Sequence, residues 1–317
     1  MKGFLFTQDL ERITTQEAFD NFIRCKKIKN LAPQSITTYE CDFKYFSEYY
    51  PPSGLCSDIT KETVYGFIEY VRERKNANDV TVYSYMTHIR AILYYFMEEG
   101  YTPKFNIEMP KKEKTIKPTY TDRELEKLLA KPNLKKCSFA EYRNWVMVNY
   151  LLATGNRLNT MINVRIRDID FDNNLIYMLK TKNKRQQIIP LSQHLKPILQ
   201  EYLGYRKGNQ EDYLFCGIHG KQLSRNGTEG IISKYNRSRN IGNTSIHMYR
   251  HTFAKKWILN GGDPFTLKDI LGHSTMDMVN QYVNIYGKDL EKVFNAYNPL
   301  DNFLRETKGE HIKMKRY

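Results

Sequence analysis

Cysteine is scarce in this 317-residue sequence, and the few cysteines present do not pair by spacing. They number five, lie far apart, and never form a C-x-x-C pair. An odd and scattered set argues against a disulfide framework, and without paired spacing a zinc site is not indicated. We therefore expect reduced, buried thiols and no structural metal.

Long apolar runs are also absent. No stretch approaches the roughly 18 apolar residues that a membrane-spanning helix needs. The first residues include Asp9 and Glu11 and lack the small-residue cleavage site of a signal peptide. Hydrophobic residues at 41% and aromatic residues at 13% exclude a disordered chain. These features predict a cytoplasmic protein with no membrane partner, and the length favours two domains.

Acidic residues are outnumbered only in the C-terminal two thirds of the chain. Residues 1–105 carry 13 Lys plus Arg against 14 Asp plus Glu, whereas the remainder carries 36 against 21. The net charge of +14 therefore belongs wholly to the remainder, and it points to a polyanionic partner. If the N-terminal part contacts DNA, it needs a locally basic face, such as Lys26 to Lys29 or Arg72 to Lys75. Solvated helix faces paired with Glu69 and Glu73 explain these runs equally well.

Helical periodicity dominates residues 15 to 101. Apolar positions recur at helical spacing, as in Phe19 and Phe22 and again in Ile89, Leu93 and Phe96. We predict four or five helices and no strand there. Residues 103–118 are rich in lysine and proline without an apolar period, which predicts an extended linker between domains.

A second domain is predicted to begin with a capped helix. Thr121 and Glu124 have the spacing of a capping box, and the apolar helix that follows from Phe139 is expected to end at Gly155. The period then changes between Ile169 and Leu191, where residues 175–179 and 187–189 read as a β-hairpin around a polar turn at 181–184. The remainder returns to helices. The predicted fold class is mainly α with a small antiparallel sheet, an α+β protein.

Histidine and arginine are concentrated in the segment from Ser245 to Ala254. His247 and Arg250 lie three positions apart and so share one face of a helix. His247 and His251, four apart, raise the alternative of a zinc site, but Met248 stands where such a motif needs glutamate. For either histidine considered alone, a satisfied place in the core is the default explanation.

Further motifs precede and follow this segment in a defined order. Arg157 follows Thr154 and Gly155, Lys182 lies on the predicted hairpin, and Leu271-Gly272-His273 precedes Tyr282 by nine positions. Taken together, the motifs resemble those of the tyrosine recombinase, or phage integrase, family along almost the whole chain. The resemblance implies a helical core-binding domain at 1–105, a basic linker at 106–118, a catalytic domain at 119–300 and a C-terminal tail at 301–317.

The resemblance also implies six catalytic residues: Arg157, Lys182, His247, Arg250, His273 and the nucleophile Tyr282. Tyr286 is the near competitor for the last role, at the wrong spacing. Thr160 stands where many family members have an acidic residue, and Asn156 replaces the usual apolar residue before the arginine. The residues around Arg157 therefore depart from the family pattern at these two positions.

The implied chemistry is DNA strand cleavage through a 3′-phosphotyrosyl intermediate without cofactor or metal. Arg157 and Arg250 can each hold two phosphate oxygens, and His273 adds a hydrogen bond. Lys182 is the candidate general acid. His247 or His251 is the candidate acceptor of the tyrosine proton, with His247 preferred.

The implied partner is double-stranded DNA with specific core sites. A homotetramer is expected to assemble on it by exchange of C-terminal tails, with an accessory directionality factor as a further partner. Intramolecular packing of the apolar tail stripe remains the alternative to exchange. The predicted role is integration or excision of a mobile element; the alternatives are Xer-type dimer resolution, a type IB topoisomerase, and a catalytically silent DNA-binding regulator.

Overall fold

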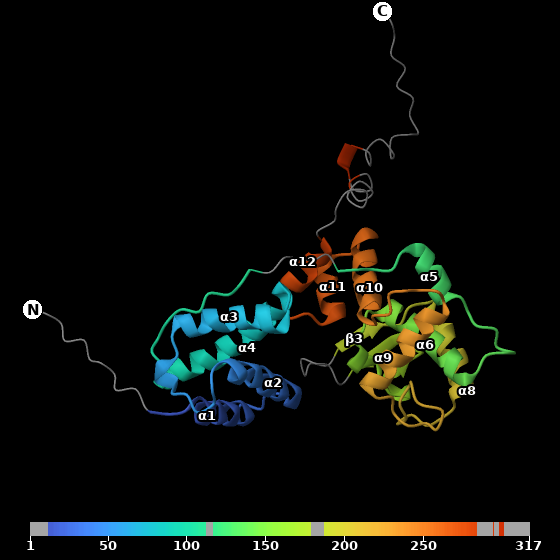
Figure 1. Ribbon diagram of the computed structural model, residues 1–317. Helices are drawn as coiled ribbons and strands as arrows, with labels where there is room; N and C mark the ends of the chain where they lie inside the picture. The colour runs from blue at the N-terminus through green and yellow to red at the C-terminus, as the bar shows by residue number, and fades with distance from the viewer. Residues whose placement is uncertain (1–11, 112–116, 179–186, 284–293, 295–297, 301–317) are drawn as a thin grey trace, which may run out of the picture. The chain divides into compact units, whose positions relative to one another are not determined.

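The computed structural model describes residues 12–111, 117–178, 187–283, 294 and 298–300. The chain divides into two compact units, Met1–Thr115 and Ile116–Tyr317, which are described separately below (Figure 1). Among the described residues, no helix is both long and apolar enough to span a membrane. The predicted tail at 301–317 lies outside the described residues. The predicted domain boundaries stay a prediction.

Unit 1 is helical throughout its described part. Its elements are α1 (Thr15–Ile28), α2 (Pro33–Tyr49), the short 3-10 helix η1 (Cys56–Asp58), α3 (Lys61–Lys75) and α4 (Asp79–Glu98). Polar side chains cap three of the α-helices, and proline begins α2, where its missing N–H costs nothing. The described residues thus confirm the prediction of four or five helices without a strand.

Aromatic side chains form the centre of unit 1. Phe22, Phe46, Phe67 and Phe96 are almost completely buried, and Phe19 stacks on Phe43 with ring centroids 3.8 Å apart. Ile107 also belongs to this core, and the partly buried side chains of Phe105 and Met109 pack against the core. Apolar packing in this unit therefore continues into the segment predicted as linker.

Unit 2 surrounds a buried central helix. Its helices are α5 (Asp122–Leu129), α6 (Phe139–Thr154), α7 (Leu158–Met161), the 3-10 helix η2 (Ile166–Asp168), α8 (Leu195–Arg206), α9 (Arg225–Ser238), α10 (His247–Leu259), α11 (Pro264–Leu271) and α12 (Asp277–Val283). Helices α5, α8, α9 and α10 all contact α6 (Figure 1). Most side chains of α6 are buried, because neighbours cover it on nearly every side.

A small antiparallel sheet completes unit 2. Its strands β1 (Ile169–Asp170), β2 (Leu175–Met178) and β3 (Gln187–Pro190) lie in sequence order, and Ile176 pairs with both Ile169 and Ile189. The predicted hairpin and the α+β fold class are confirmed. The third strand, β1, was missed, since two residues are too short to show alternation. The predicted turn at 181–184 lies outside the described residues.

The start of unit 2 is hydrogen-bonded to α10. The Tyr249 hydroxyl donates to Asn236 Oδ1 at 2.6 Å, and Asn236 Nδ2 donates to the Tyr120 hydroxyl at 2.7 Å. The backbone N–H of Tyr120 donates to Thr252 Oγ1 at 2.9 Å. Because the three side chains are buried and satisfy one another, they fix the orientation of α10 relative to the start of the unit. The predicted capping box of Thr121 and Glu124 follows immediately and is confirmed.

Candidate active site

The first candidate arginine is positioned by the end of α6. Gly155 ends that helix, as predicted, with a left-handed backbone of φ +62°. A Cβ atom at Gly155 would lie 2.6 Å from the Phe253 ring of α10, so close packing as well as backbone conformation requires glycine. Two residues later, Arg157 is the N-cap of α7 and is half-buried.

Arg250 on α10 is held by backbone oxygens rather than by an acid. Its side chain is buried, and it donates from Nη1 to Gly155 O and from Nη2 to Leu271 O, both at 2.9 Å. Arg157 Nη1 also donates to Leu271 O, at 3.3 Å. The two guanidinium groups therefore converge on one carbonyl at the end of α11. Burial and the charge of Arg157 lower the pKa of Arg250 to about 10, which leaves it charged at neutral pH.

His273 follows this carbonyl and joins the same cluster. Its Nε2 lies 2.6 Å from Arg250 Nη2, so Nε2 must accept and the ring proton must be on Nδ1. Nδ1 is buried without a hydrogen-bond partner in the described part of the chain. Burial, together with Arg250 and Arg157, lowers the pKa of His273 to about 4, which keeps the ring neutral at pH 7.

Tyr282 is paired with a histidine of α10. Its hydroxyl lies 2.7 Å from His251 Nδ1, and the side chain is buried with Val279 and Leu271 in a small core formed by α10, α11 and α12. Burial raises the pKa of Tyr282 above its ordinary value, although Arg250 and Arg157 act in the opposite direction. The hydroxyl is therefore protonated at neutral pH, and its attack on an electrophile needs a base.

His251 has the properties of such a base. Burial, followed by the positive charges of Lys117, His247 and Arg250, lowers its pKa to about 4. Its ring is neutral at pH 7, and Nδ1 can accept a proton when the other ring nitrogen carries the hydrogen. His247, the acceptor preferred from sequence, is instead an exposed side chain at the first position of α10. Partial desolvation and then Arg225 lower the pKa of His247.

The sixth candidate, Lys182, lies outside the described residues, between β2 and β3. The structure thus brings together Arg157, Arg250, His273 and Tyr282 and adds His251 to them. His247 occupies the same helix one turn before His251. Over the described ranges, no group of three or more His, Cys, Asp or Glu is arranged to hold a metal ion.

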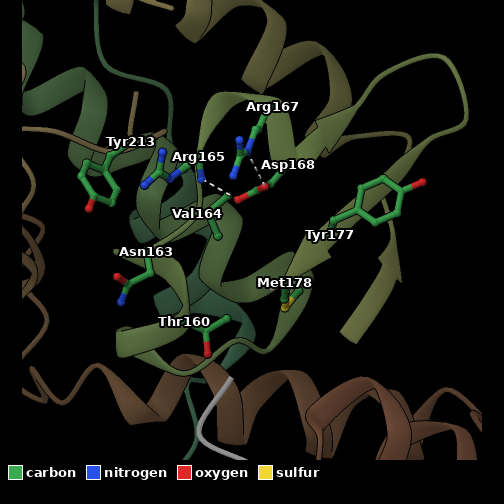
Figure 2. A pocket seen from close by; sticks show the side chains of 9 residues that line it. All are labelled: Thr160, Asn163, Val164, Arg165, Arg167, Asp168, Tyr177, Met178 and Tyr213. Carbon is green, nitrogen blue, oxygen red and sulfur yellow. Dashed lines mark hydrogen bonds and ion pairs between the residues drawn. The ribbon is translucent and has the colours of Figure 1, made fainter. Parts of the chain in front are cut away.

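The surroundings of Thr160 show where the nearby carboxylates are engaged. Thr160 lines a small cavity of about 80 Å³ together with Asn163, Tyr177 and Met178 (Figure 2). On another side of this cavity, Asp168 accepts a hydrogen bond from the backbone N–H of Arg165 at 2.8 Å.

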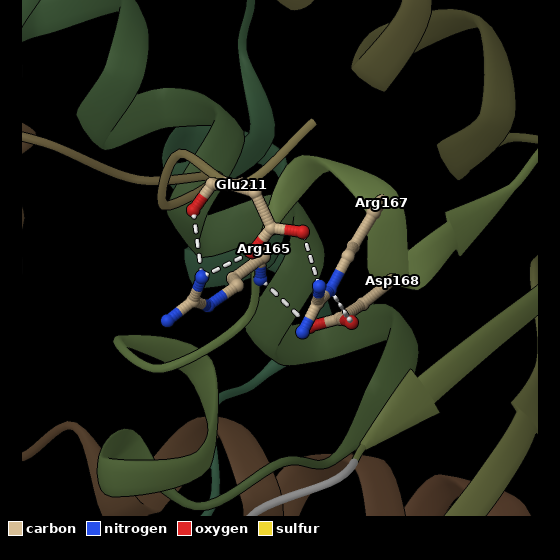
Figure 3. A network of polar contacts seen from close by, with 4 residues as sticks. All are labelled: Arg165, Arg167, Asp168 and Glu211. Carbon is tan, nitrogen blue, oxygen red and sulfur yellow. Dashed lines mark hydrogen bonds and ion pairs between the residues drawn. The ribbon is translucent and has the colours of Figure 1, made fainter. Parts of the chain in front are cut away.

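Glu211 forms ion pairs with both Arg165 and Arg167 (Figure 3). Arg167 Nε also lies 3.9 Å from Asp168. Arg165 and Arg167 thus engage these two acids. The contact described for Arg157 is instead with the Leu271 carbonyl, so that carbonyl supports Arg157 in the absence of an acidic residue at position 160.

Comparison with known proteins identifies the family. Residues 119–288 match the Phage integrase family. The chain belongs to this family. Residues 14–115 match the Phage integrase SAM-like domain. The predictions of a tyrosine recombinase family member and of a site-specific recombination enzyme are confirmed.

Relatives extend over nearly the full length of this phage integrase family member. Tyrosine recombinase XerD of Oceanobacillus iheyensis is 25% identical over 296 residues, covering 89% of this chain and 97% of the relative. Tyrosine recombinase XerD of Staphylococcus epidermidis is 27% identical over 301 residues, covering 90% and 99%.

Solved structures share the fold. The Tn1549 transposon integrase in complex with a circular intermediate DNA has a TM-score of 0.71 at 18% identity, covering 89% of this chain and 98% of that one. A lambda integrase dimer bound to a core site has a TM-score of 0.67 at 15% identity, covering 84% and 97%. These likenesses place the helical units and small sheet described above in a fold that integrases also adopt.

Proposed function

We propose that this recombinase cleaves and rejoins DNA strands with Tyr282 as the nucleophile, Arg157 and Arg250 as phosphate ligands, His273 as the acceptor that orients Arg250, and His251 as the proton acceptor. The observation that carries the proposal is the 2.7 Å contact between the Tyr282 hydroxyl and His251 Nδ1, made beside two arginines whose charges act on that hydroxyl. DNA is the expected partner, as in the integrase complexes with which the chain shares its fold.

The chemical step follows from the geometry of these groups. The Tyr282 oxygen attacks the scissile phosphorus, its proton passes to His251 Nδ1, and a phosphate–tyrosine bond forms at the DNA 3′ end. The bond to the 5′ oxygen breaks, and Lys182 supplies the proton that this oxygen needs. Negative charge gathers on the non-bridging oxygens, where permanently charged guanidinium groups stabilise it most. The 5′ hydroxyl of a second strand reverses the step, so rejoining needs neither a nucleotide cofactor nor a metal ion.

Replacing His251 with glutamine is expected to slow covalent adduct formation about 100-fold or more, as loss of a general base does. In the wild-type protein, protonation of His251 should not slow cleavage until the pH approaches 4, because the pKa of His251 is lowered to about 4. In the variant, the residual rate should rise about tenfold per pH unit between pH 6 and 9, because only ionised tyrosine can then attack. Single-turnover cleavage of nicked DNA across this range measures both effects.

His247→Gln is the matched control, since it changes the same residue type one helical turn away. The cleavage rate of His247→Gln should stay independent of pH, and it should fall less than the rate of His251→Gln. If His247→Gln instead produced the steep pH dependence and His251→Gln did not, the assignment of the proton acceptor would be wrong.

We assign residues 1–105 as the core-binding domain, 106–118 as the linker, 119–300 as the catalytic domain and 301–317 as a tail that is exchanged between subunits of a DNA-bound tetramer. The matches at 14–115 and 119–288 support a two-domain division.

We place the enzyme in the cytoplasm, with integration or excision of a mobile element as its role and an accessory directionality factor as a further partner. Likeness to the transposon integrase fold favours this role, and likeness to the XerD sequences favours dimer resolution as the second candidate.

Mapping the covalent adducts on host DNA tests this function. The wild-type protein is incubated with fragmented host DNA, and the trapped fragments are sequenced. We expect adducts at paired sites that flank a discrete element. Adducts at one chromosomal site would support dimer resolution instead. Adducts at arbitrary sequences, with relaxation of supercoils, would indicate a type IB topoisomerase, and their complete absence would contradict strand cleavage.

A further inference from the structure

The end of α11 holds the cluster of phosphate-binding groups together. Leu271 O accepts from both Arg157 and Arg250, and His273 follows two residues later. Any displacement of this helix end would move the acceptor that aligns both guanidinium groups. The position of the last turn of α11 therefore determines the geometry of the site.

One side chain from the sheet binds this helix end. Gln187, the first residue of β3, donates from Nε2 to Asp269 O at 2.7 Å and also to Ile270 O. Carbonyls in the last turn of a helix lack partners within the helix, so these hydrogen bonds cap α11 at its C-terminus. The backbone N–H groups of Gly272 and His273 complete the cap by donating to Asp269 O and Lys268 O, each at 3.0 Å.

The backbone conformation of Gly272 and its lack of a side chain both suit this contact. Its backbone is left-handed, at φ +61°, and a Cβ atom there would lie 3.1 Å from Gln187 Oε1. The glutamine amide thus lies directly against the turn between Leu271 and His273. Within the sheet, Gln187 of β3 pairs with Met178 of β2, and it lies five positions after Lys182 in the sequence.

We propose that Gln187 is a positioning residue of this recombinase: its amide fixes the end of α11, and through the Leu271 carbonyl and His273 it aligns Arg157 and Arg250 on the scissile phosphate. Gln187 itself contacts none of the reacting atoms in this proposal. The inference rests on the proposed function, because it assigns Gln187 a task at that same site. Gln187 contacts α11, so we expect it to act on the phosphate ligands and not on the general acid.

Gln187→Leu is the variant that tests the proposal. It removes both hydrogen bonds while keeping a side chain of similar size, and we expect adduct formation at saturating DNA to slow about 10- to 100-fold. DNA affinity and the thermal midpoint should change little. Gln187→Lys should recover most of the rate, because an ammonium group can donate to both carbonyls and is favoured at a helix C-terminus. Gln200→Leu, the same change at an exposed position of α8, should match the wild type.

A second substrate separates the phosphate ligands from the general acid. In DNA whose bridging 5′ oxygen is replaced by sulfur, the leaving group needs no proton, so a Lys182→Ala variant should regain its rate. Gln187→Leu should remain slow on this DNA. Recovery of Gln187→Leu on the sulfur substrate, a wild-type rate on ordinary DNA, or failure of Gln187→Lys to recover would overturn the proposal. Absence of an adduct even with the wild-type protein would instead refute the proposed function.

Discussion

Replacing Tyr282 with phenylalanine is expected to abolish the covalent adduct, with a fall in rate of at least about 10,000-fold, because the attacking oxygen is removed and the groups around it cannot replace it. The ring still fills its place in the core with Val279 and Leu271, so folding should be preserved. The measurement is a denaturing gel of protein incubated with nicked DNA, on which the adduct migrates as a single shifted band.

Tyr286→Phe is the control for this prediction, since it makes the same change at the next tyrosine in the sequence. It should form the adduct at the wild-type rate. Binding of both variants to DNA, measured by mobility shift, should equal that of the wild-type protein. An adduct that survived in Tyr282→Phe and vanished in Tyr286→Phe would show that the nucleophile had been misassigned.

Arg250→Lys is expected to reduce adduct formation about 100- to 1000-fold although the positive charge is kept. Lysine carries its N–H donors on a single nitrogen, whereas Arg250 reaches Gly155 O and Leu271 O from two separate nitrogens of a planar fork, so lysine cannot reproduce this geometry and also hold a phosphate oxygen. The loss should fall on the rate at saturating DNA, because the site is formed for the transition state and not for DNA affinity. Single-turnover kinetics over a range of DNA concentrations separate the two quantities.

The matched control is Arg237→Lys, on the exposed face of α9. It should leave the rate at saturating DNA unchanged. The thermal midpoint of each variant shows whether the fold is intact, which matters because Arg250 is buried. Equal rates for Arg250→Lys and the wild-type protein would refute the role of the planar guanidinium group.

Sequence alone could predict those parts of the fold whose causes are local. The capping box of Thr121 depends on residues three apart, and the αL end of α6 depends on Gly155 itself. The β2–β3 hairpin follows from two short apolar runs separated by a polar segment. The strand β1 lacks such a pattern, because its two residues form part of the sheet only through pairing with β2.

The partners within the site could not be predicted in the same way. His247 and His251 are both close to Arg250 in sequence, and which of them meets Tyr282 depends on how α12 packs against α10. The convergence of Arg157 and Arg250 on Leu271 O involves a backbone group, which leaves no trace in residue type. The Gln187 contact joins β3 to the end of α11, more than 80 positions later in the sequence. Long-range packing sets all three.

Tyr120 accepts a hydrogen bond from Asn236 and donates one to Thr252, and these two contacts bear on how this enzyme can be re-engineered. Exchanging target specificity among integrases requires a junction at which a foreign binding domain is fused to the catalytic part. A junction after Tyr120 would replace a residue that belongs to the interior of the catalytic unit and so disturb the helix that bears Arg250 and His251. A junction before residue 117 keeps that anchor with its own partners. Chimeric recombinases built on this chain should therefore retain Tyr120 as part of the catalytic half.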